Sequence, residues 1–416
     1  MAAISVVIPV YNVQDYLAQS VRSVREQSLS DIEIILVNDG STDDSGRIAA
    51  ELASVDSRIV LVNKPNGGLS SARNAGIKAA SSEYVCFLDS DDLMEPEACS
   101  VIVSAFERTG ADVVTYGANL YPEFVDSPWT VRVLSPRDVE YLRFDSALLF
   151  KEAATPFAWR TACRLEQLRR SGLLFDETLP FGEDQVFLFQ LYPRLEHVSL
   201  ISNKLVKYRM ARPGSLMDTH VYDAVRLARA HVDIAERIVM DWHHLGLVEG
   251  RETEILDWLA EFSILRAMQL DEGERNVVLD SLKRVLTACF PEADLVKYAN
   301  EDLAGDFIKA IMLDESYRRG NKRRLAVYKH FLKTEGKKSV LRRIFGAVGS
   351  APIFSPMVRL KNAISGKTRK GADIELRRKV WESKDLEDRT AAAAALEREL
   401  KEASTSYSVD GATVLG

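Results

Sequence analysis

Three carboxylates crowd the end of one apolar segment. YVCFLDSDD (84–92) is apolar for most of its length and then places Asp89, Asp91 and Asp92 within four positions. Carboxylates at this spacing repel one another unless a cation lies among them. Oxygen ligands of this kind suit Mg²⁺ or Mn²⁺, so the DxD pair could hold one divalent cation and its bound diphosphate. The alternative is structural, because the same acids could cap and charge the start of the next helix.

Polar or aromatic residues also follow two earlier apolar segments. Tyr11 comes after ISVVIPV and could stack on a nucleobase; Asp39 comes after IEIILV and could accept a hydrogen bond from a base N–H. Either residue is more commonly an ordinary turn residue. No GxGxxG follows the first segment and no GxxxxGK[ST] occurs, which excludes the Rossmann and P-loop fingerprints. A nucleotidyltransferase is disfavoured because no glycine-rich loop with Arg or Lys follows the first segment.

The elements that must position these residues alternate between two periods. Strands are expected at 4–10, 32–37, 58–62, 84–89 and 111–117, and helices at 14–28, 43–54, 70–80 and from Pro96 to Gly110. This alternation is typical of an α/β fold with a mostly parallel sheet flanked by helices. Such sheets bind ligands at the carboxyl ends of their strands. The candidate residues are therefore expected to meet at one edge.

The apolar period becomes helical from about residue 220, and a long charged helix is expected over 374–403. We therefore predict three parts: an α/β domain at 1–218, a mainly α-helical domain at 219–315, and a basic, helical extension at 316–416.

Composition limits the compartment and the cofactors. The four cysteines are scattered with no CxxC pair, which argues against a disulfide framework or a zinc site and fits a reducing cytoplasm. The six histidines form no HExxH spacing. The N-terminus does not read as a signal peptide, and no segment reaches the roughly 18 apolar residues of a membrane span. The expected location is cytoplasmic, with a peripheral position on the inner face of the cell membrane as an option.

A basic block interrupts an otherwise acidic chain. Residues 317–379 contain 19 Lys or Arg against three acids, although the whole chain carries a net charge of −7. The block could lie on an anionic membrane, follow a polyanionic acceptor, or form a solvated helical surface or an oligomer contact. Nucleic acid is disfavoured, since no recognised binding module accompanies the charge.

Four segments together resemble a known family. SVVIPVYN, IEIILVNDGSTDDS, NGGLSSARNAGI and YVCFLDSDD, in this order, are similar to family 2 glycosyltransferases with a GT-A nucleotide-sugar fold. The resemblance is dense over 3–117, thinner to about 216, and absent from the C-terminal half. It implies a metal-dependent, inverting transfer of a hexosyl or N-acetylhexosaminyl group from a UDP-sugar. The acceptor would be a hydroxyl of a cell-surface glycan, a lipid-linked molecule or a teichoic-acid-type polymer.

The resemblance also implies roles for matching residues on the donor side. Tyr11 and Asp39 would hold the uracil, and the backbone near Pro9 would line the pocket. Arg73 would lie near the base or the diphosphate. Asp89 would contact the ribose or a metal-bound water, Asp91 would ligate Mn²⁺ or Mg²⁺, and Asp92 would support the loop or cap a helix.

On the acceptor side, FGEDQVFLFQL (181–191) matches the family's ED motif, and its GEDQ also occurs in wall-teichoic-acid glycosyltransferases. It implies Asp184 as the base, with Glu183 beside it; the alternative is that both acids only charge a helix N-terminus. The W-x-K-L-Y-R stretch of many relatives is reduced here to Trp159 and Arg164, and Trp159 is the candidate acceptor contact in it. YRMARPGSL (208–216) resembles a loop that closes over the diphosphate in some relatives, which implies Arg209 and Arg212 as phosphate contacts; the alternative is that both are ordinary surface arginines.

Two features of processive synthases, QxxRW and membrane spans, are not found in the sequence. A catalytically silent nucleotide-sugar-binding or scaffold protein of a polysaccharide assembly system remains the alternative function. The presence of Asp39, Asp89, Asp91 and Asp184 argues against it.

Overall fold

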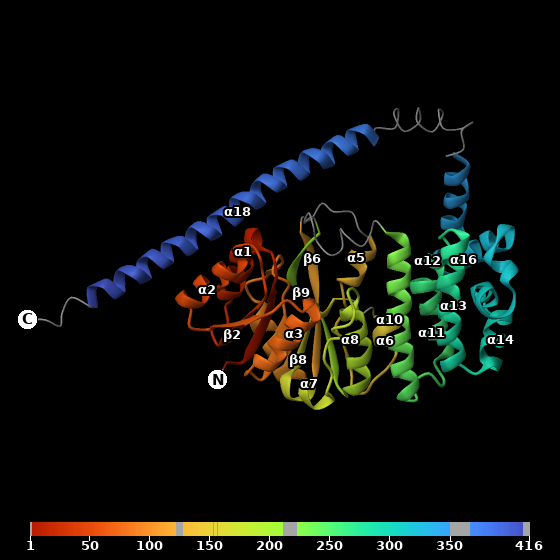
Figure 1. Cartoon of the computed structure of the whole chain (residues 1–416), viewed down its shortest axis with the longest axis horizontal. Helices are drawn as coiled ribbons and strands as arrows, with labels where there is room; N and C mark the ends of the chain where they lie inside the picture. Colours follow the sequence, from red (N-terminus) through yellow and green to blue (C-terminus); the bar gives the residue numbers. More distant parts are fainter. Residues whose placement is uncertain are drawn as a thin grey trace, which may run out of the picture. The chain divides into compact units, whose positions relative to one another are not determined.

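The structure, a computed structural model, describes residues 2–121, 128–152, 154–155, 157–210, 223–349 and 367–410. The chain forms two compact units (Figure 1). Unit 1 combines Met1–Arg212 with Arg377–Gly416, and unit 2 is Pro213–Leu376. The predicted division into three domains, with boundaries at residues 218 and 315, stays a prediction. The observed grouping adds that the last segment of the chain returns to the first unit.

One mixed sheet organises unit 1. Within the described residues its strands lie in the order β3-β2-β1-β4-β8-β6-β9-β5, with β7 beside β9. The strands are β1 (Ile4–Val10), β2 (Ile32–Asp39), β3 (Ile59–Lys64), β4 (Tyr84–Phe87), β5 (Leu93–Met94), β6 (Val113–Tyr121), β7 (Val139–Tyr141), β8 (Thr161–Arg164) and β9 (Val198–Arg209).

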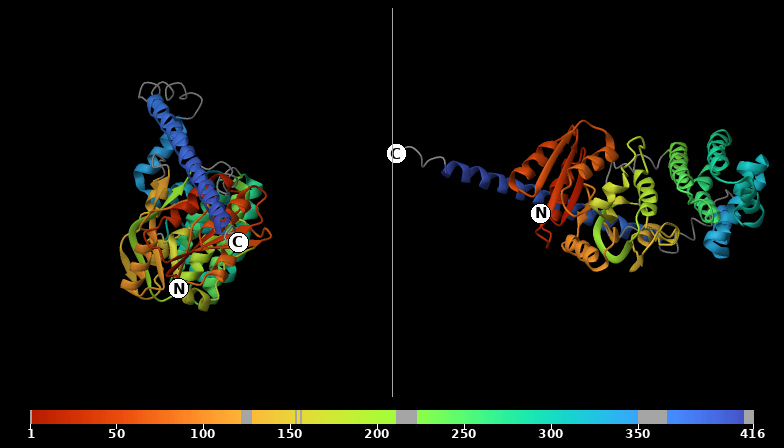
Figure 2. Two further views of the ribbon diagram at one scale, coloured as in Figure 1. Left: turned by 90° about the vertical axis from the view of Figure 1, so that its left-hand side faces the viewer. Right: turned by 90° about the horizontal axis from the view of Figure 1, so that it is seen from below.

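The N-terminal half of the sheet is parallel, as Figure 2 shows for its red and orange strands. β1 pairs in parallel with β2 on one side and β4 on the other, and all seven of its residues are buried. Its sequence, apolar and mostly β-branched apart from Ser5, suits a strand covered on both faces. β8 then inserts antiparallel between β4 and β6, which makes the sheet mixed. The predicted α/β fold is confirmed.

Helices cover this sheet. They are α1 (Gln14–Arg25), α2 (Ser45–Val55), α3 (Gly68–Ala79), α4 (Ala98–Thr109), α5 (Pro128–Val133), α6 (Ala147–Phe150), α7 (Leu165–Ser171) and α8 (Glu183–Leu191), with the 3₁₀ turns η1 (Ala158–Arg160) and η2 (Tyr192–Arg194). α3 approaches β1 so closely that a Cβ on Gly76 would lie 2.2 Å from Cγ1 of Val7. Only glycine permits this approach, so Gly76 fixes the distance between helix and strand.

The last helix, α18 (Lys367–Asp410), is the long charged helix expected from the sequence. From Arg377 onward it belongs to unit 1, where it runs past α1 and α2 (Figure 1). Ala392 and Leu396 are buried along it, one turn apart on the same face. The helix is therefore docked on the α/β unit rather than solvated all round.

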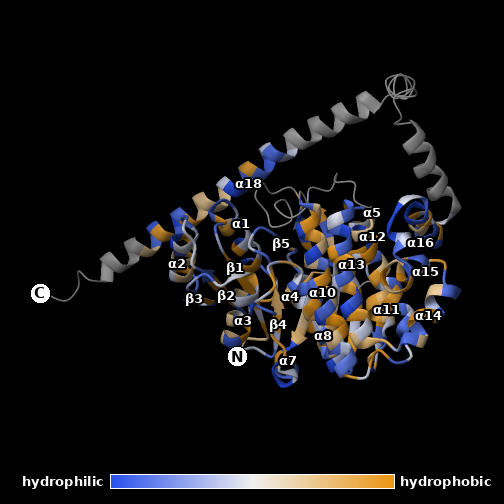
Figure 3. Ribbon diagram, turned by 45° about the vertical axis from the view of Figure 1, so that its right-hand side comes forward, coloured by the Kyte–Doolittle hydropathy of each residue, from blue (hydrophilic) through white to orange (hydrophobic). Residues whose placement is uncertain are grey.

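Unit 2 is helical. Its elements are α10 (Ala224–His244), α11 (Glu252–Leu259), η3 (Ala260–Ile264), α12 (Leu265–Ala267), α13 (Glu272–Cys289), α14 (Glu292–Glu301), α15 (Gly305–Ile308), η4 (Lys309–Leu313), η5 (Glu315–Arg318) and α16 (Gly320–Gly349), which is kinked at Gly336. α10 and α13 pack together through apolar faces, and their outer faces are polar (Figure 3). The predicted helical character of the C-terminal half is confirmed. Of the helices in the described ranges, none is both long and apolar enough to cross a membrane.

Several cations in the first part of the basic block pair with acids of unit 2. Arg318 pairs with Asp280 at 2.8 Å, and Lys329 pairs with Asp306 at 2.7 Å. Lys333 reaches Asp257 and Asp302, at 2.6 and 2.7 Å. These cations hold helices of unit 2 together, so they are not a free basic patch.

Candidate active site

The carboxyl ends of β1, β2 and β4 lie at one edge of the sheet. Register aligns Val10 with Asn38, and Val7 with Phe87. The segments that follow these strands therefore begin side by side, as expected for parallel neighbours.

Tyr11 projects from the end of β1, with 47% of its surface exposed. The next residue, Asn12, has a positive φ of 49°, and its Oδ1 accepts a hydrogen bond from Thr42 N at 2.8 Å. This local turn presents the Tyr11 ring to solvent, where it is available for stacking. Pro9, by contrast, is a buried strand residue paired with Val37.

Asp39 is buried at the end of β2 and already has several partners. Its carboxylate accepts hydrogen bonds from the backbone N–H groups of Gly67, at 3.0 and 3.2 Å, and Gly68, at 2.8 Å. The Lys64 ammonium also pairs with it. As placed, Asp39 orders the start of α3. A carboxylate offers about four lone-pair sites, so a base N–H must share or displace one of these contacts. The uracil role stays a prediction.

Arg73 joins the two acidic motifs. Its side chain is 2% exposed, and its guanidinium donates to Asp89 Oδ1 at 2.9 Å and to Glu183 Oε1 at 2.8 Å. It also lies over the Phe175 ring at 5.2 Å. Burial alone lowers the pKa of Arg73, but the carboxylates of Asp89, Glu183 and Asp184 outweigh burial and raise it. Arg73 is thus a charged link between the loop after β4 and the start of α8.

The loop after β4 turns back on itself. Asp92 N donates to Asp89 O at 2.9 Å, and the Asp92 carboxylate is buried with Oδ1 accepting from Arg209 N at 2.7 Å. Its other oxygen, Oδ2, has no hydrogen-bond partner within the described part of the chain. Asp92 does not cap a helix, since α4 begins later, at Ala98. Burial, and then the charges of Asp91 and Asp89, raise the pKa of Asp92 well above its usual value.

A divalent cation fits the chemistry of this loop, although a complete protein cage does not form. Over the described ranges, no group of three or more His, Cys, Asp or Glu side chains converges on one point. A Mg²⁺-type site needs only one or two carboxylates when phosphate oxygens and water complete the coordination. Asp91 could supply one such carboxylate, and Asp89, whose carboxylate is paired with Arg73, could reach the cation through a bound water.

Asp184 lies in the first turn of α8, beside Glu183. Its two carboxylate oxygens accept hydrogen bonds from Gln185 N at 2.7 Å and Phe157 N at 2.9 Å. Phe157 has a positive φ of 78°, which is strained for a side chain of that size. Burial, followed by the nearby charge of Glu183, raises the pKa of Asp184 to about 7. A carboxylate with this pKa is suited to accept a proton near neutral pH.

Trp159 is buried beside Phe157, the residue whose N–H donates to Asp184. It is 2% exposed and stacks on Phe157 and Tyr208, with ring centroids 5.2 and 5.1 Å apart. As placed, its ring braces Phe157, the residue that holds Asp184. A direct contact with the acceptor stays a prediction. Sequence reasoning missed Phe157 because no residue type signals a positive φ at that position.

Arg209, expected at the diphosphate, is buried at the end of β9 and committed to an ion pair with Asp385 at 2.5 Å. Phosphate contact by Arg209 stays a prediction, and it would require the guanidinium to leave this partner. Arg212 lies outside the described residues. Sequence reasoning missed Asp385 entirely, since 176 positions separate it from Arg209.

The N-terminal part of the chain matches the model of glycosyl transferase family 2, over residues 5–159. The glycosyltransferase GlyG of Streptococcus pneumoniae is 40% identical over 253 residues, which are 59% of this chain and 82% of GlyG. The chain belongs to glycosyl transferase family 2. The predicted resemblance is confirmed.

Other family 2 relatives match a smaller part of their own length. The glycosyltransferase EpsJ of Bacillus subtilis is 37% identical over 52% of this chain and 63% of EpsJ. The minor teichoic acid biosynthesis protein GgaB, also of B. subtilis, is 26% identical over 68% of this chain and 32% of GgaB. The chain therefore spans less than two thirds of EpsJ and about a third of GgaB.

Solved structures share the fold. TarS of S. aureus, residues 1–349 in complex with UDP-GlcNAc, aligns with a TM-score of 0.60 and 19% identity, covering 80% of this chain and 92% of that one. At this identity the likeness establishes the GT-A-type fold of this family 2 chain.

Proposed function

We propose that this chain is an inverting glycosyltransferase that uses Mn²⁺ or Mg²⁺ and moves a sugar from a UDP-sugar to an acceptor hydroxyl. The observation that carries the proposal is the double ion pair of Arg73, at 2.9 Å from Asp89 and 2.8 Å from Glu183. One buried cation joins the acids expected at the donor to those expected at the acceptor. A two-substrate transfer requires this proximity.

The donor would lie along the edge formed by β1, β2 and β4. Tyr11 is exposed there and would stack on the uracil, with the backbone at Pro9 lining the pocket. Asp39 would accept the base N–H after sharing its contacts with Gly67 and Gly68. The solved TarS complex with UDP-GlcNAc, on the same fold, supports a UDP-sugar as donor.

Asp91 would hold the divalent cation, and Asp89 would contact the ribose or a cation-bound water. When bound, the cation neutralises charge on the diphosphate that departs. The protein's part is to keep the two acids in place, through the pairing of Arg73 with Asp89 and the contacts of Asp92 with the β9 backbone.

Asp184 would act as the base. The acceptor oxygen forms a bond to the anomeric carbon as the bond from that carbon to the β-phosphate oxygen breaks. The electron pair of the broken bond leaves with UDP, and the hydroxyl proton passes to Asp184. Attack on the face opposite UDP inverts the anomeric configuration. The raised pKa of Asp184, about 7, supports this role.

For the acceptor we propose a hydroxyl of a cell-surface glycan, a lipid-linked molecule or a teichoic-acid-type polymer, supported by the similarity to GgaB. A peripheral position on the inner face of the membrane, through residues 317–379, belongs to the same proposal. The described cations at the start of the block pair with acids of unit 2. Membrane or polymer contact would therefore depend on the basic residues from Lys337 onward.

The test is UDP release by the full chain from a panel of UDP-sugars, with Mn²⁺, with Mg²⁺ and with a chelator. We expect at least one sugar nucleotide to yield UDP, and the chelator to suppress it. A catalytically silent scaffold would instead bind a UDP-sugar, seen as a raised melting temperature, and release no UDP. If no sugar nucleotide either turns over or shifts the melting temperature, the proposal is wrong.

A further inference from the structure

The C-terminal helix α18 reaches the acidic loop after β4 through one arginine. We infer that Asp385, on α18, is a positioning residue for this loop, acting through Arg209 to set Asp91 and Asp92. This inference rests on the proposed function of the loop as the cation and diphosphate site. It adds a residue from the far end of the chain to that site.

Arg209 contacts the loop twice. Its backbone N–H donates to the Asp92 carboxylate at 2.7 Å, and its side-chain Nε donates to the Asp91 carbonyl oxygen at 2.7 Å. The first contact holds the Asp92 side chain, and the second holds the backbone carbonyl of Asp91. The contact with the carbonyl depends on the Arg209 side chain, and it orients the backbone from which the Asp91 carboxylate extends.

Asp385 holds the other side of the same guanidinium. Nη1 of Arg209 pairs with Asp385 Oδ1 at 2.5 Å, and Nη2 donates to Gln19 at 2.9 Å. The two charged side chains are 1% and 4% exposed. Removing one member of so buried a pair leaves an uncompensated charge, so the arginine would be expected to move.

Aromatic rings limit the alternatives open to Arg209. Its guanidinium lies over Tyr16 at 5.0 Å, Tyr121 at 4.9 Å and Trp381 at 6.0 Å. Tyr121 also donates to Asp385 at 3.2 Å and packs edge-on against Trp381 at 5.2 Å. The arginine is thus enclosed by α1, β6 and α18, and Asp385 supplies the carboxylate that pairs with its guanidinium.

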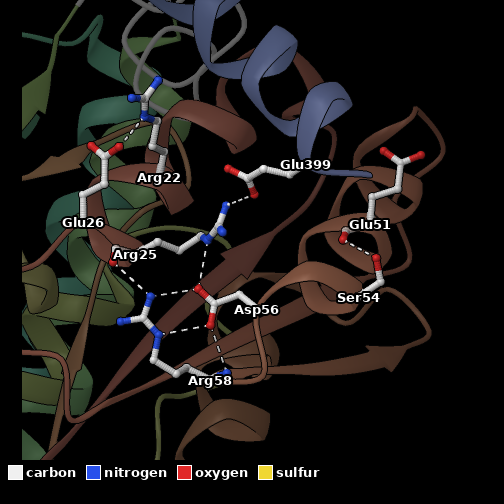
Figure 4. A network of polar contacts seen from close by, with 8 residues as sticks. All are labelled: Arg22, Arg25, Glu26, Glu51, Ser54, Asp56, Arg58 and Glu399. Carbon is white, nitrogen blue, oxygen red and sulfur yellow. Dashed lines mark hydrogen bonds and ion pairs between the residues drawn. The ribbon is translucent and has the colours of Figure 1, made fainter. Parts of the chain in front are cut away.

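A second anchor holds α18 without touching the loop. Glu399 pairs with Arg25 at 2.9 Å, and Arg25 in turn pairs with Asp56 (Figure 4). Glu399 is 14 residues beyond Asp385, about four helical turns along α18. Loss of Glu399 would loosen the docked helix at its far end and leave Arg209 in place. It is therefore a matched control for Asp385.

The experiment compares the full chain with its Asp385→Asn and Glu399→Gln variants. Binding of Mn²⁺ at saturating UDP is followed by the electron paramagnetic resonance of free Mn²⁺, and UDP binding without metal is measured by calorimetry. Partners behind metal ligands typically affect metal affinity by about 10–100-fold. We expect a loss of that size for Asp385→Asn, nearly unchanged metal-free UDP binding, and little change in either for Glu399→Gln.

Amide hydrogen exchange without metal gives a second readout. Asp385→Asn is expected to accelerate exchange of the Asp92 and Arg209 amides, which Glu399→Gln should leave protected. Tyr121→Phe removes one hydrogen bond to Asp385 and keeps the ion pair, so it should shift Mn²⁺ affinity and exchange in the same direction by less. If Asp385→Asn does not fold, this milder variant decides.

Wild-type affinity in Asp385→Asn, or in Tyr121→Phe where that variant decides, would overturn the inference alone. Equal losses in Asp385→Asn and Glu399→Gln would also overturn it, because helix docking would then explain both. If the wild-type chain shows no metal-dependent UDP binding, the proposed function fails, and the inference fails with it.

Discussion

Nη1 of Arg73 donates to Glu183 Oε1 across 2.8 Å, although 110 positions separate the two residues in the chain. The same guanidinium reaches Asp89, so it carries the electrostatic link between the two acidic motifs. Arginine suits this buried position, because its forked guanidinium can donate to two carboxylates at once.

Arg73→Met would remove this link and leave Asp89 and Glu183 without their cation. We expect the free energy of unfolding to fall by about 3–5 kcal/mol, as for other broken buried pairs. The measurement is urea denaturation. Arg170→Met is the control, because its pair with Glu166 is roughly two-thirds exposed and should cost less than about 1 kcal/mol. Similar stabilities for the two variants would contradict the assigned role of Arg73.

Asp184 gives a prediction for pH dependence. Burial raises its pKa to about 7, and a base works only when deprotonated. The transfer rate, as kcat/KM, should therefore rise about tenfold per pH unit below the pKa and level off above it. Asp184→Asn should lower transfer by about 10²–10⁴-fold and keep UDP binding. A flat profile between about pH 5.5 and about pH 8, or retained transfer in Asp184→Asn, would reject Asp184 as the base.

A substitution at Gly76 tests the close packing of α3 against β1. Gly76→Ala would put a Cβ 2.2 Å from Cγ1 of Val7. Overpacking of this kind typically costs about 1–3 kcal/mol, measurable by urea denaturation. The same substitution in a Val7→Ala background should cost less, since the clashing methyl groups are gone. An equal cost in both backgrounds would show that the close approach is not the cause.

The basic block gives a prediction about membranes. Lys337, Lys338, Arg342 and Arg343 follow the cations that pair within unit 2. Each basic residue near an anionic surface contributes about 1 kcal/mol, so replacing all four by Gln should weaken binding to phosphatidylserine vesicles by about 10³-fold. Neutral phosphatidylcholine vesicles serve as the control. Unchanged binding by the variant would remove membrane contact from the proposal.

The strands and their polar ends could be predicted from the sequence, because burial and chain order alone specify them. The run ISVVIPV predicts β1, and YVCFLD predicts a strand over 84–89, of which Tyr84–Phe87 forms β4. Parallel strands share a carboxyl edge, so Tyr11, Asp39 and Asp89 could be grouped before any coordinates were known.

The partners of the buried charges could not be predicted in this way. Arg209 is one arginine among many, and nothing local distinguishes a phosphate contact from a pair with Asp385, 176 residues later. The antiparallel insertion of β8 was equally hidden, since a four-residue strand carries too short a pattern to specify its neighbours. Tertiary context decides both features.

The most direct test of the central claim is a calorimetric titration of UDP into the full chain, with and without Mn²⁺, for the wild type and for Asp91→Asn. If the loop after β4 is the cation and diphosphate site, Mn²⁺ should tighten UDP binding to the wild type, and Asp91→Asn should lose that metal-dependent gain while keeping its metal-free affinity. Equal enhancement by Mn²⁺ in the two proteins, or none in the wild type, would contradict the account.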